Sequence, residues 1–290
     1  MIKPMLAETA EKPFDDPQWL YELKIDGGRC IAYVDGETKL FTRSGNEITA
    51  KFPELAPVRT VKPCILDGEI TSNTLKFGDF QGRIHKVREL DIRIASKKNP
   101  MIYFVFDIIA IGGESLMGKP LIERKAILAD NLRSDCAVRI LPHFSQGITL
   151  FEQTKIAGLE GIIAKRRHST YQEGRRSRDW LKIKNFQEGT FEIHGVTKGE
   201  NARGSTFGAL ILGKDGKFAG CCGTGFDDAT LRQLLERLLP LRTTKCELHG
   251  LELAKEVLFF SEPRLCCEIR FLEYGTDGHL RFPSYRRLIR

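Results

Sequence analysis

A lysine beside a pair of glycines is the first place in the chain where side chains could do covalent chemistry. Lys24 is followed by Asp26, Gly27 and Gly28, and Arg29 closes the stretch. Glycine lets a backbone approach a ligand closely, and the planar guanidinium of arginine suits phosphate. The stretch therefore indicates phosphate chemistry. By itself it leaves open whether the lysine is a nucleophile or an ordinary phosphate-binding cation.

A nucleophilic lysine has to lose its proton before it attacks phosphorus. The usual lysine pKa is about 10.4, and a catalytic value near about 7–8 requires burial or neighbouring cations. The chain offers such cations in Arg29 and in the alternating segment 180–184, where Lys182 and Lys184 share one face of a strand. We expect these three cations to lie beside Lys24.

Two glutamates could hold a metal ion for the same reaction. Glu69 ends the segment 66–69, and Glu160 precedes Gly161 in a segment that runs to Lys165. Mg²⁺ is bound through one or two carboxylates with several waters retained, although two solvated glutamates would look the same. Glu160 and Lys165 are an odd number of residues apart, so a regular strand cannot aim both at one site. We expect Glu160 just before a strand, with Gly161 absorbing a twist.

The elements that must position these residues are mainly short strands. Apolar patterns predict strands over 19–25, 29–34, 39–43, 65–70 and 180–184, and a strand buried on both faces over 101–110. Helical spacing or terminal signals predict helices over 81–93, 120–132 and 149–158. Phe106, in the buried strand, is either plain core or an aromatic face for a purine.

The character of the chain changes after residue 185. Five short strands and a helix over 228–239 are typical of a small Greek-key barrel of the oligonucleotide-binding (OB) type. The predicted fold class is α+β. A domain with antiparallel sheets and flanking helices covers 1–187, and a β-barrel OB-fold domain covers 188–290.

Composition restricts the partners and the compartment. A hydrophobic content of 41% is enough for packed cores, and a net charge of +7 favours a polyanionic partner. The chain has no apolar run of about 18 residues, and its first residues lack a secretory apolar core. We therefore expect no membrane span, no signal peptide and a cytoplasmic location. The 8 cysteines form no Cys-x-x-Cys pair, which favours small buried thiols over a zinc site.

Taken together, these segments resemble the motifs of covalent nucleotidyltransferases, in the order in which that family has them. The matching segments are Lys24–Arg29, Thr42–Gly45, Leu66–Glu69, Phe104–Asp107, Glu160–Lys165 and Trp180–Lys184. The segment Tyr171–Ser177 is similar to that of ATP-dependent DNA ligases. The resemblance covers nearly the whole chain. It is nearest to small bacterial ligases with only a catalytic core and to the ligase component of bacterial end-joining.

The resemblance implies a role for each residue of the motifs. Lys24 would take AMP from ATP as a covalent adduct. The other implied nucleotide contacts are Glu22 and Phe106 on the adenine, Glu69 on the ribose, Arg29, Lys165, Lys182 and Lys184 on phosphates, and Arg43 and Arg176 near the nucleotide or the DNA phosphate. Glu69 and Glu160 would bind Mg²⁺ (or Mn²⁺).

The implied function is the sealing of 5′-phosphate/3′-hydroxyl nicks in duplex DNA, in repair or end-joining. The reaction would pass through a lysyl-AMP intermediate and a DNA-adenylate. The implied partner is nicked double-stranded DNA, with an end-binding protein or a polymerase as a further candidate, and the enzyme would be a monomer. The alternatives are an RNA ligase, a capping-type nucleotidyltransferase, and a non-catalytic basic OB protein that only binds nucleic acid.

One departure from the family concerns the C-terminal arginines. The family usually ends its barrel with an Arg-x-Asp-Lys element that orients the departing pyrophosphate. Here Arg286, Arg287 and Arg290 occur where the motif is approached, and no Asp-Lys pair follows. We therefore expect self-adenylation to lag behind sealing by pre-adenylated enzyme, unless these arginines substitute for the missing pair or the native C-terminus is longer.

Overall fold

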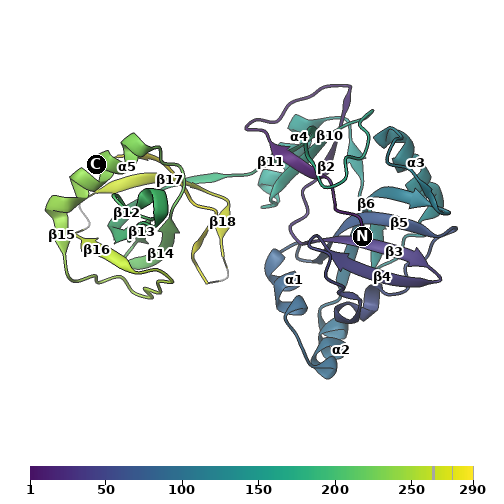
Figure 1. The fold of residues 1–290 in the computed structure, drawn as a ribbon, viewed down its shortest axis with the longest axis horizontal. Coiled ribbons are helices and arrows are strands. Elements are labelled where there is room, and N and C mark those ends of the chain that lie inside the picture. Colours follow the sequence, from purple (N-terminus) through teal and green to yellow (C-terminus); the bar gives the residue numbers. More distant parts are fainter. Residues whose placement is uncertain (263–264, 276, 290) are drawn as a thin grey trace. The chain divides into compact units, whose positions relative to one another are not determined.

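The chain folds as two compact units. The structure, a computed structural model, describes residues 1–262, 265–275 and 277–289, and the units are Met1–Asn185 and Phe186–Arg290 (Figure 1). The domain boundary expected after residue 187 lies inside strand β12, which begins at Gln187. In the described part of the chain, no helix is long and apolar enough to cross a membrane.

A five-stranded sheet carries the lysines of the first unit. Its order is β1 (Leu6–Thr9), β11 (Arg176–Lys184), β10 (Gly161–Arg166), β2 (Trp19–Leu23) and β9 (His143–Phe144). Only the β1–β11 pair of this sheet is parallel in the described residues. Gly161 opposes Lys184 at the start of β10 and has φ +137°, a conformation that L side chains rarely adopt. The expected twist at Gly161, with Glu160 just before the strand, is confirmed.

A second, six-stranded sheet lies in the same unit. It contains β4 (Glu37–Thr42), β3 (Gly28–Asp35), β5 (Cys64–Ser72), β6 (Met101–Ile111), β7 (Glu114–Ser115) and β8 (Val138–Ile140). β8 pairs with β6 in parallel, and the other pairs are antiparallel. Most of β6 is buried, as its continuous apolar run predicts.

Four α-helices flank these sheets. They are α1 (Phe77–Ile84), α2 (Glu89–Lys98), α3 (Leu121–Asn131) and α4 (Gly147–Ile156), with short 3₁₀ turns at Thr49–Lys51 and Pro53–Leu55. Pro120 caps α3, and Gly158 has φ +65° just beyond α4, so both terminal signals in the sequence are confirmed.

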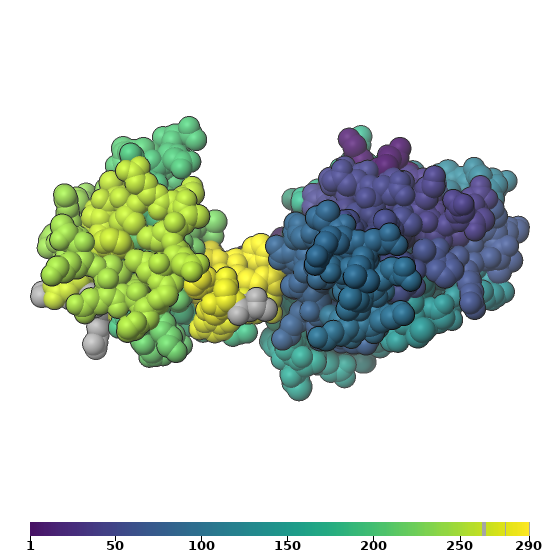
Figure 2. All heavy atoms as spheres, turned by 90° about the horizontal axis from the view of Figure 1, so that it is seen from below, coloured from purple at the N-terminus to yellow at the C-terminus, as the bar shows by residue number. Residues whose placement is uncertain are grey.

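The single helix predicted over 81–93 is wrong. The chain leaves helical geometry after Ile84, and α2 begins only after the extended residue Arg88. Val87 and Leu90, whose spacing suggested a buried stripe, are 86% and 68% exposed. In Figure 2 the blue segment that carries α1 and α2 lies on the viewed surface of its unit. The helical spacing of a few apolar residues in this short segment did not correspond to a buried helix face.

The second unit is built mainly of strands. Its large sheet contains β12 (Gln187–Thr197), β13 (Leu210–Lys214), β14 (Lys217–Cys222), β15 (Arg242–Thr243), β16 (Val257–Ser261), β17 (Cys266–Phe271) and β20 (Ser284–Leu288). The remaining elements are α5 (Asp228–Leu238), the small pair β18 (Glu273–Tyr274) and β19 (Leu280–Arg281), and 3₁₀ turns at Asn201–Arg203 and Leu239–Leu241. The α+β fold class is confirmed.

The C-terminal arginines belong to β20 or follow it. Arg287 makes an ion pair with Glu268 at 2.8 Å, and Arg286 lies 3.8 Å from Glu188. Arg290 lies outside the described residues. The expected lag of self-adenylation behind sealing stays a prediction, with substitution by these arginines as its alternative.

Candidate active site

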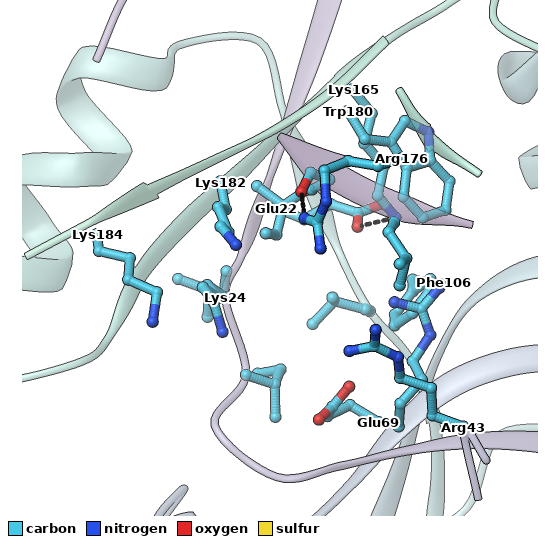
Figure 3. Close-up of a pocket in the computed structure, with 17 residues that line it drawn as sticks. Glu22, Lys24, Arg43, Glu69, Phe106, Lys165, Arg176, Trp180, Lys182 and Lys184 are labelled. Atoms are coloured by element: carbon cyan, nitrogen blue, oxygen red, sulfur yellow. Dashed lines mark hydrogen bonds and ion pairs between the residues drawn. The ribbon is translucent and has the colours of Figure 1, made fainter. Parts of the chain in front are cut away.

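A pocket of about 280 Å³ opens in the first unit. Its lining draws on strands of both sheets and includes every residue that was predicted to contact a nucleotide (Figure 3). These residues are Glu22, Lys24, Arg29, Arg43, Glu69, Phe106, Lys165, Arg176, Lys182 and Lys184. Residues that are far apart in the sequence therefore meet in one cavity.

One wall of the pocket follows from the register of the five-stranded sheet. Ile163 of β10 opposes Glu22 of β2 on one side and Lys182 of β11 on the other. Directly paired residues project to the same face of a sheet, so Glu22 and Lys182 share a face. Lys165 and Trp180, paired two residues along, project to that face as well. Alternation thus turns a basic strand into a one-sided row of cations.

The opposite wall comes from the six-stranded sheet. Arg29 of β3, Glu69 of β5 and Phe104 of β6 are paired across three neighbouring strands. Phe106 lies two residues beyond Phe104 and lines the pocket together with Arg29 and Glu69. In Figure 3 Arg43 and Glu69 lie across the cavity from Lys182 and Lys184.

Lys24 lies just past the end of β2 rather than within it. Its backbone N–H donates to the carbonyl of Gly161 at 2.9 Å, which ties it to the start of β10. Its ammonium group forms an ion pair with Glu160, and the other oxygen of Glu160 binds Lys184 at 2.7 Å. Glu160 therefore bridges two cations, and it places Lys24 beside the row on β11.

The charges around Glu160 settle its ionisation. Burial acts to raise the pKa of Glu160, but the positive charges of Lys24 and Lys184 and their hydrogen bonds outweigh burial and lower it. Partial burial, followed by the neighbouring cations Arg176, Lys184 and Lys24, lowers the pKa of Lys182. Glu160 is thus a fixed carboxylate among mutually repelling cations, and the excess of positive charge beside it suits a polyanion.

Glu69 is the carboxylate without a partner. Within the described residues, no hydrogen bond or ion pair reaches its oxygens, although it lines the pocket. Burial raises the pKa of Glu69 to about 7 against the lowering effect of Arg29 and Lys24, and Asp67 and Glu160 add to the rise. A half-buried carboxylate without a direct ion pair is a natural ligand for a hard cation.

A buried charge cluster lies under Phe106. Glu22 forms ion pairs with Lys125 of α3 and with Lys165, the latter at 2.7 Å. The Lys165 ammonium also lies 4.1 Å from the ring centroids of Phe106 and Trp180. Burial lowers the pKa of Lys165 to about 8, with Glu22 opposing and Lys125 adding to the effect.

Arg29 does not face Lys24 as an unpaired cation. Its guanidinium makes two hydrogen bonds of 2.6 Å to the carboxylate of Asp67, and Tyr171 donates to the same carboxylate at 2.7 Å. Lys184 is likewise paired, with Glu160, so Lys182 remains as the main candidate for activating Lys24.

Sequence reasoning missed Asp67, Tyr171 and Lys125 as supporting residues. Asp67 stands inside the motif from which only Glu69 was selected. Its signal was the two-residue spacing, which places both carboxylates on one face of β5. Lys125 had no sequence signal, because its partner Glu22 lies 103 residues away.

Comparison with known proteins gives the family. A family model described as the ATP dependent DNA ligase domain matches residues 4–184, and one described as the ATP dependent DNA ligase C terminal region matches residues 203–290. The chain belongs to the ATP-dependent DNA ligase family. The first match spans all of the pocket residues.

Individual relatives of this ligase-family chain agree with that assignment. The SPbeta prophage-derived DNA ligase-like protein LigB of Bacillus subtilis is 32% identical, over 98% of this chain and 97% of LigB. The multifunctional non-homologous end joining protein LigD of Mycolicibacterium smegmatis is 33% identical over 98% of this chain. That match is 38% of LigD, so the chain spans little more than a third of such relatives.

A solved structure shows the same fold. Mycobacterial DNA ligase D complexed with ATP and MES superposes with a TM-score of 0.56 at 27% identity, covering 99% of this chain and 95% of that one.

Proposed function

We propose that this chain is an ATP-dependent DNA ligase that seals nicks in duplex DNA through a lysyl-AMP intermediate and a DNA-adenylate. The observation that carries the proposal is the place of Lys24. Its ammonium lies in a pocket whose polar lining is mostly cationic, between the basic face of β11 and the carboxylates Glu69 and Glu160. A pocket that only held nucleic acid would need neither carboxylate.

The first chemical step is adenylation of Lys24. After loss of its proton, the Lys24 nitrogen attacks the α-phosphorus of ATP. The N–P bond forms as the bond to the bridging oxygen breaks, and pyrophosphate leaves with the electron pair. Lys182 and Lys184 stabilise the negative charge on the phosphoryl oxygens. In this proposal Glu22 and Phe106 hold the adenine, and Arg43 and Arg176 lie at the rim for phosphates.

The two sealing steps act on two phosphorus atoms in turn, first that of AMP and then that of the 5′-phosphate. A 5′-phosphate oxygen of the nick attacks the AMP phosphorus, and the bond to Lys24 breaks. The 3′-hydroxyl then attacks the 5′-phosphorus, so that a phosphodiester forms, a proton is released and AMP leaves. Each displacement is made easier because the leaving group of one step is already activated by the step before.

Mg²⁺ or Mn²⁺ fits the acidic groups of this pocket. Mg²⁺ in nucleotide sites uses one or two protein carboxylates together with substrate phosphates. The carboxylate of Glu69, which forms no ion pair in the described residues, offers such a ligand, and Glu160 is the second candidate. When bound by these carboxylates, the ion would supply positive charge that offsets the charge developing on the phosphate oxygens.

The proposed substrate is nicked duplex DNA, held through its phosphates more than its bases. Support comes from the net charge of +7 and from relatives named as DNA ligases and end-joining repair proteins. The proposal places the chain in the cytoplasm as a monomer that acts in repair or end-joining, where an end-binding protein or a polymerase is a candidate partner.

Intact mass after incubation with ATP and Mg²⁺ tests the proposal. The wild type should gain an AMP adduct, and Lys24→Ala should gain none. Lys24→Arg keeps a cation beside Glu160, so its lack of adduct would show that the nucleophile, and not the ion pair, is what matters. Lys12→Ala, at an exposed position, is the control that should label normally. An equal adduct on Lys24→Ala would overturn the assignment.

Substrate tests separate the alternative functions. Adduct formation from GTP in place of ATP would indicate a capping-type enzyme. Sealing of nicked RNA in place of nicked DNA would indicate an RNA ligase. A wild type that binds DNA and never gains AMP would be a binding protein only.

A further inference from the structure

The charge cluster under the pocket has one more lysine than pairing requires. Glu22, Lys125 and Lys165 have side chains that are 1%, 4% and 2% exposed. Among the described residues that line the pocket, Glu22 and Lys165 are included and Lys125 is not. Lys125 therefore stands behind the carboxylate, on the side of α3.

Lys125 connects two strands that supply pocket residues. Its ammonium forms an ion pair with Oε1 of Glu22 on β2, and it donates to the carbonyl oxygen of Phe106 on β6 at 3.0 Å. Lys165 takes the other carboxylate oxygen of Glu22 at 2.7 Å. A single buried nitrogen thus fixes the carboxylate of Glu22 relative to the backbone that carries the Phe106 ring.

The cost of burying this cluster argues for a role beyond stability. Each buried ion loses hydration, and an ion pair regains this only with good geometry. Glu22 and Lys165 alone would already balance in charge. The second lysine leaves one positive charge in excess, and a well-packed apolar side chain in its place would avoid that penalty.

The second lysine makes Glu22 an obligate acceptor. Burial acts to raise the pKa of Glu22, but the charges of Lys125 and Lys165 outweigh it and lower the pKa. An ionised carboxylate accepts hydrogen bonds and donates none. The base edge that meets Glu22 must therefore offer an N–H group, such as the 6-amino group of adenine.

We propose that Lys125 is a positioning residue that sets nucleobase selectivity by holding Glu22 as a fixed acceptor against the purine edge. This inference rests on the proposed function, because it takes ATP as the nucleotide of the pocket. It adds a residue that touches no substrate atom and acts through Glu22 and the Phe106 backbone.

Adenylation kinetics with two nucleotides test the inference. ATP is compared with purine riboside triphosphate, which lacks the 6-amino group, in the wild type, Lys125→Met and Lys125→Arg. A hydrogen bond to a charged group is worth about 1.5–3 kcal/mol, roughly tenfold to a hundredfold. In Lys125→Met the preference for ATP in kcat/KM should fall by about tenfold or more. The change should lie mainly in the KM for ATP, and Lys125→Arg should restore most of the preference.

A matched control comes from the neighbouring residue of the same helix. Arg124 is fully buried, makes two 2.8 Å bonds to Asp107, and also donates to the carbonyls of Lys119 and Ser169. Arg124→Lys weakens a comparable buried pair without touching Glu22. It should lower the melting temperature while keeping the nucleotide preference. An unchanged preference in a folded Lys125→Met, or an equal loss in Arg124→Lys, would overturn the inference.

A failure of the proposed function can be distinguished from a failure of the proposed role of Lys125. If the wild type forms no AMP adduct, the function fails, and calorimetric binding of the two nucleotides to wild type and Lys125→Met replaces the kinetics. A binding preference for ATP that shrinks in Lys125→Met would still support the role of Lys125. Equal binding of both nucleotides by the wild type would overturn it.

Discussion

Glu69 lines the pocket, and folding disfavours its ionised form. Its pKa is raised to about 7 by burial, so folding favours the protonated form. The contribution of protonated Glu69 to the stability of the folded protein is fully present below the unfolded-state pKa near 4.5. It is lost as the pH rises through about 7. Glu69→Gln stays neutral and should be more stable than the wild type above pH 7, by about 2 kcal/mol.

Denaturant unfolding of both proteins from pH 5 to pH 8.5, without divalent ions, measures this difference. The two stabilities should converge at the acid end, and the variant should fail to adenylate. A variant that is less stable than the wild type at pH 8 would contradict the argument. Mg²⁺ should raise the stability of the wild type and leave Glu69→Gln unchanged, because it binds where the carboxylate is.

At the residue scale, the sequence could predict which side chains share a face of a strand. Lys182, Lys184 and Trp180 share a face because the side-chain period of a strand is two, which is local information. The Asp67–Arg29 and Lys125–Glu22 pairs depend on which elements pack together, and no local pattern carries that. The residues that support the pocket therefore needed the structure, whereas the charged residues of its lining did not.

Gly161 is the element-scale feature on which the site depends. A Cβ there would lie 2.1 Å from the carbonyl oxygen of Ile183 and 2.9 Å from the Cα of Lys184. Gly161→Ala should push β10 away from β11 and move Glu160 relative to Lys24. Crowding together with positive-φ strain should cost about 3 kcal/mol or more, and AMP adduct formation should fall steeply.

Gly158→Ala is the matched control for that change. Gly158 also has positive φ, but among the described residues no atom lies within 4 Å of the place that a Cβ would take there. Its cost should be about 1 kcal/mol, with adenylation intact. Thermal unfolding and adduct mass measure both variants. Equal losses in the two would mean that backbone conformation alone, and not the contact with β11, makes Gly161 necessary.

Elements were predictable where a terminal signal or a long pattern existed. Pro120 and Gly158 mark helix ends through backbone geometry, and the 101–110 run is long enough to require a buried strand. The 81–93 prediction failed because an apolar spacing over so few residues arises without burial, and Val87 projects into solvent. In that segment α1 ends at Ile84, and α2 begins after the extended residue Arg88. No residue type in the sequence signals this break.

At the scale of the whole molecule, each unit carries its own apolar interior. Three clusters of buried side chains lie within the first unit, and two lie within the second. The pocket is lined by residues of the first unit alone, as far as the described chain shows. Composition could indicate the change of character near residue 185. The position of the cut depends on β12, whose pairing with β17 begins at Gln187.

A fragment of residues 1–185 should therefore fold and bind ATP without the rest of the chain. Because its cores and its pocket are complete, calorimetry should give one cooperative unfolding transition and an ATP affinity within about threefold of the full chain, well under 1.4 kcal/mol. Nick sealing should be lost, because the proposed function requires the second unit to help hold the phosphates of the duplex. The full chain in parallel is the control. An unfolded fragment would show that the first unit needs the second in order to fold. A fragment that seals nicks at the full rate would show that the second unit is not required for sealing.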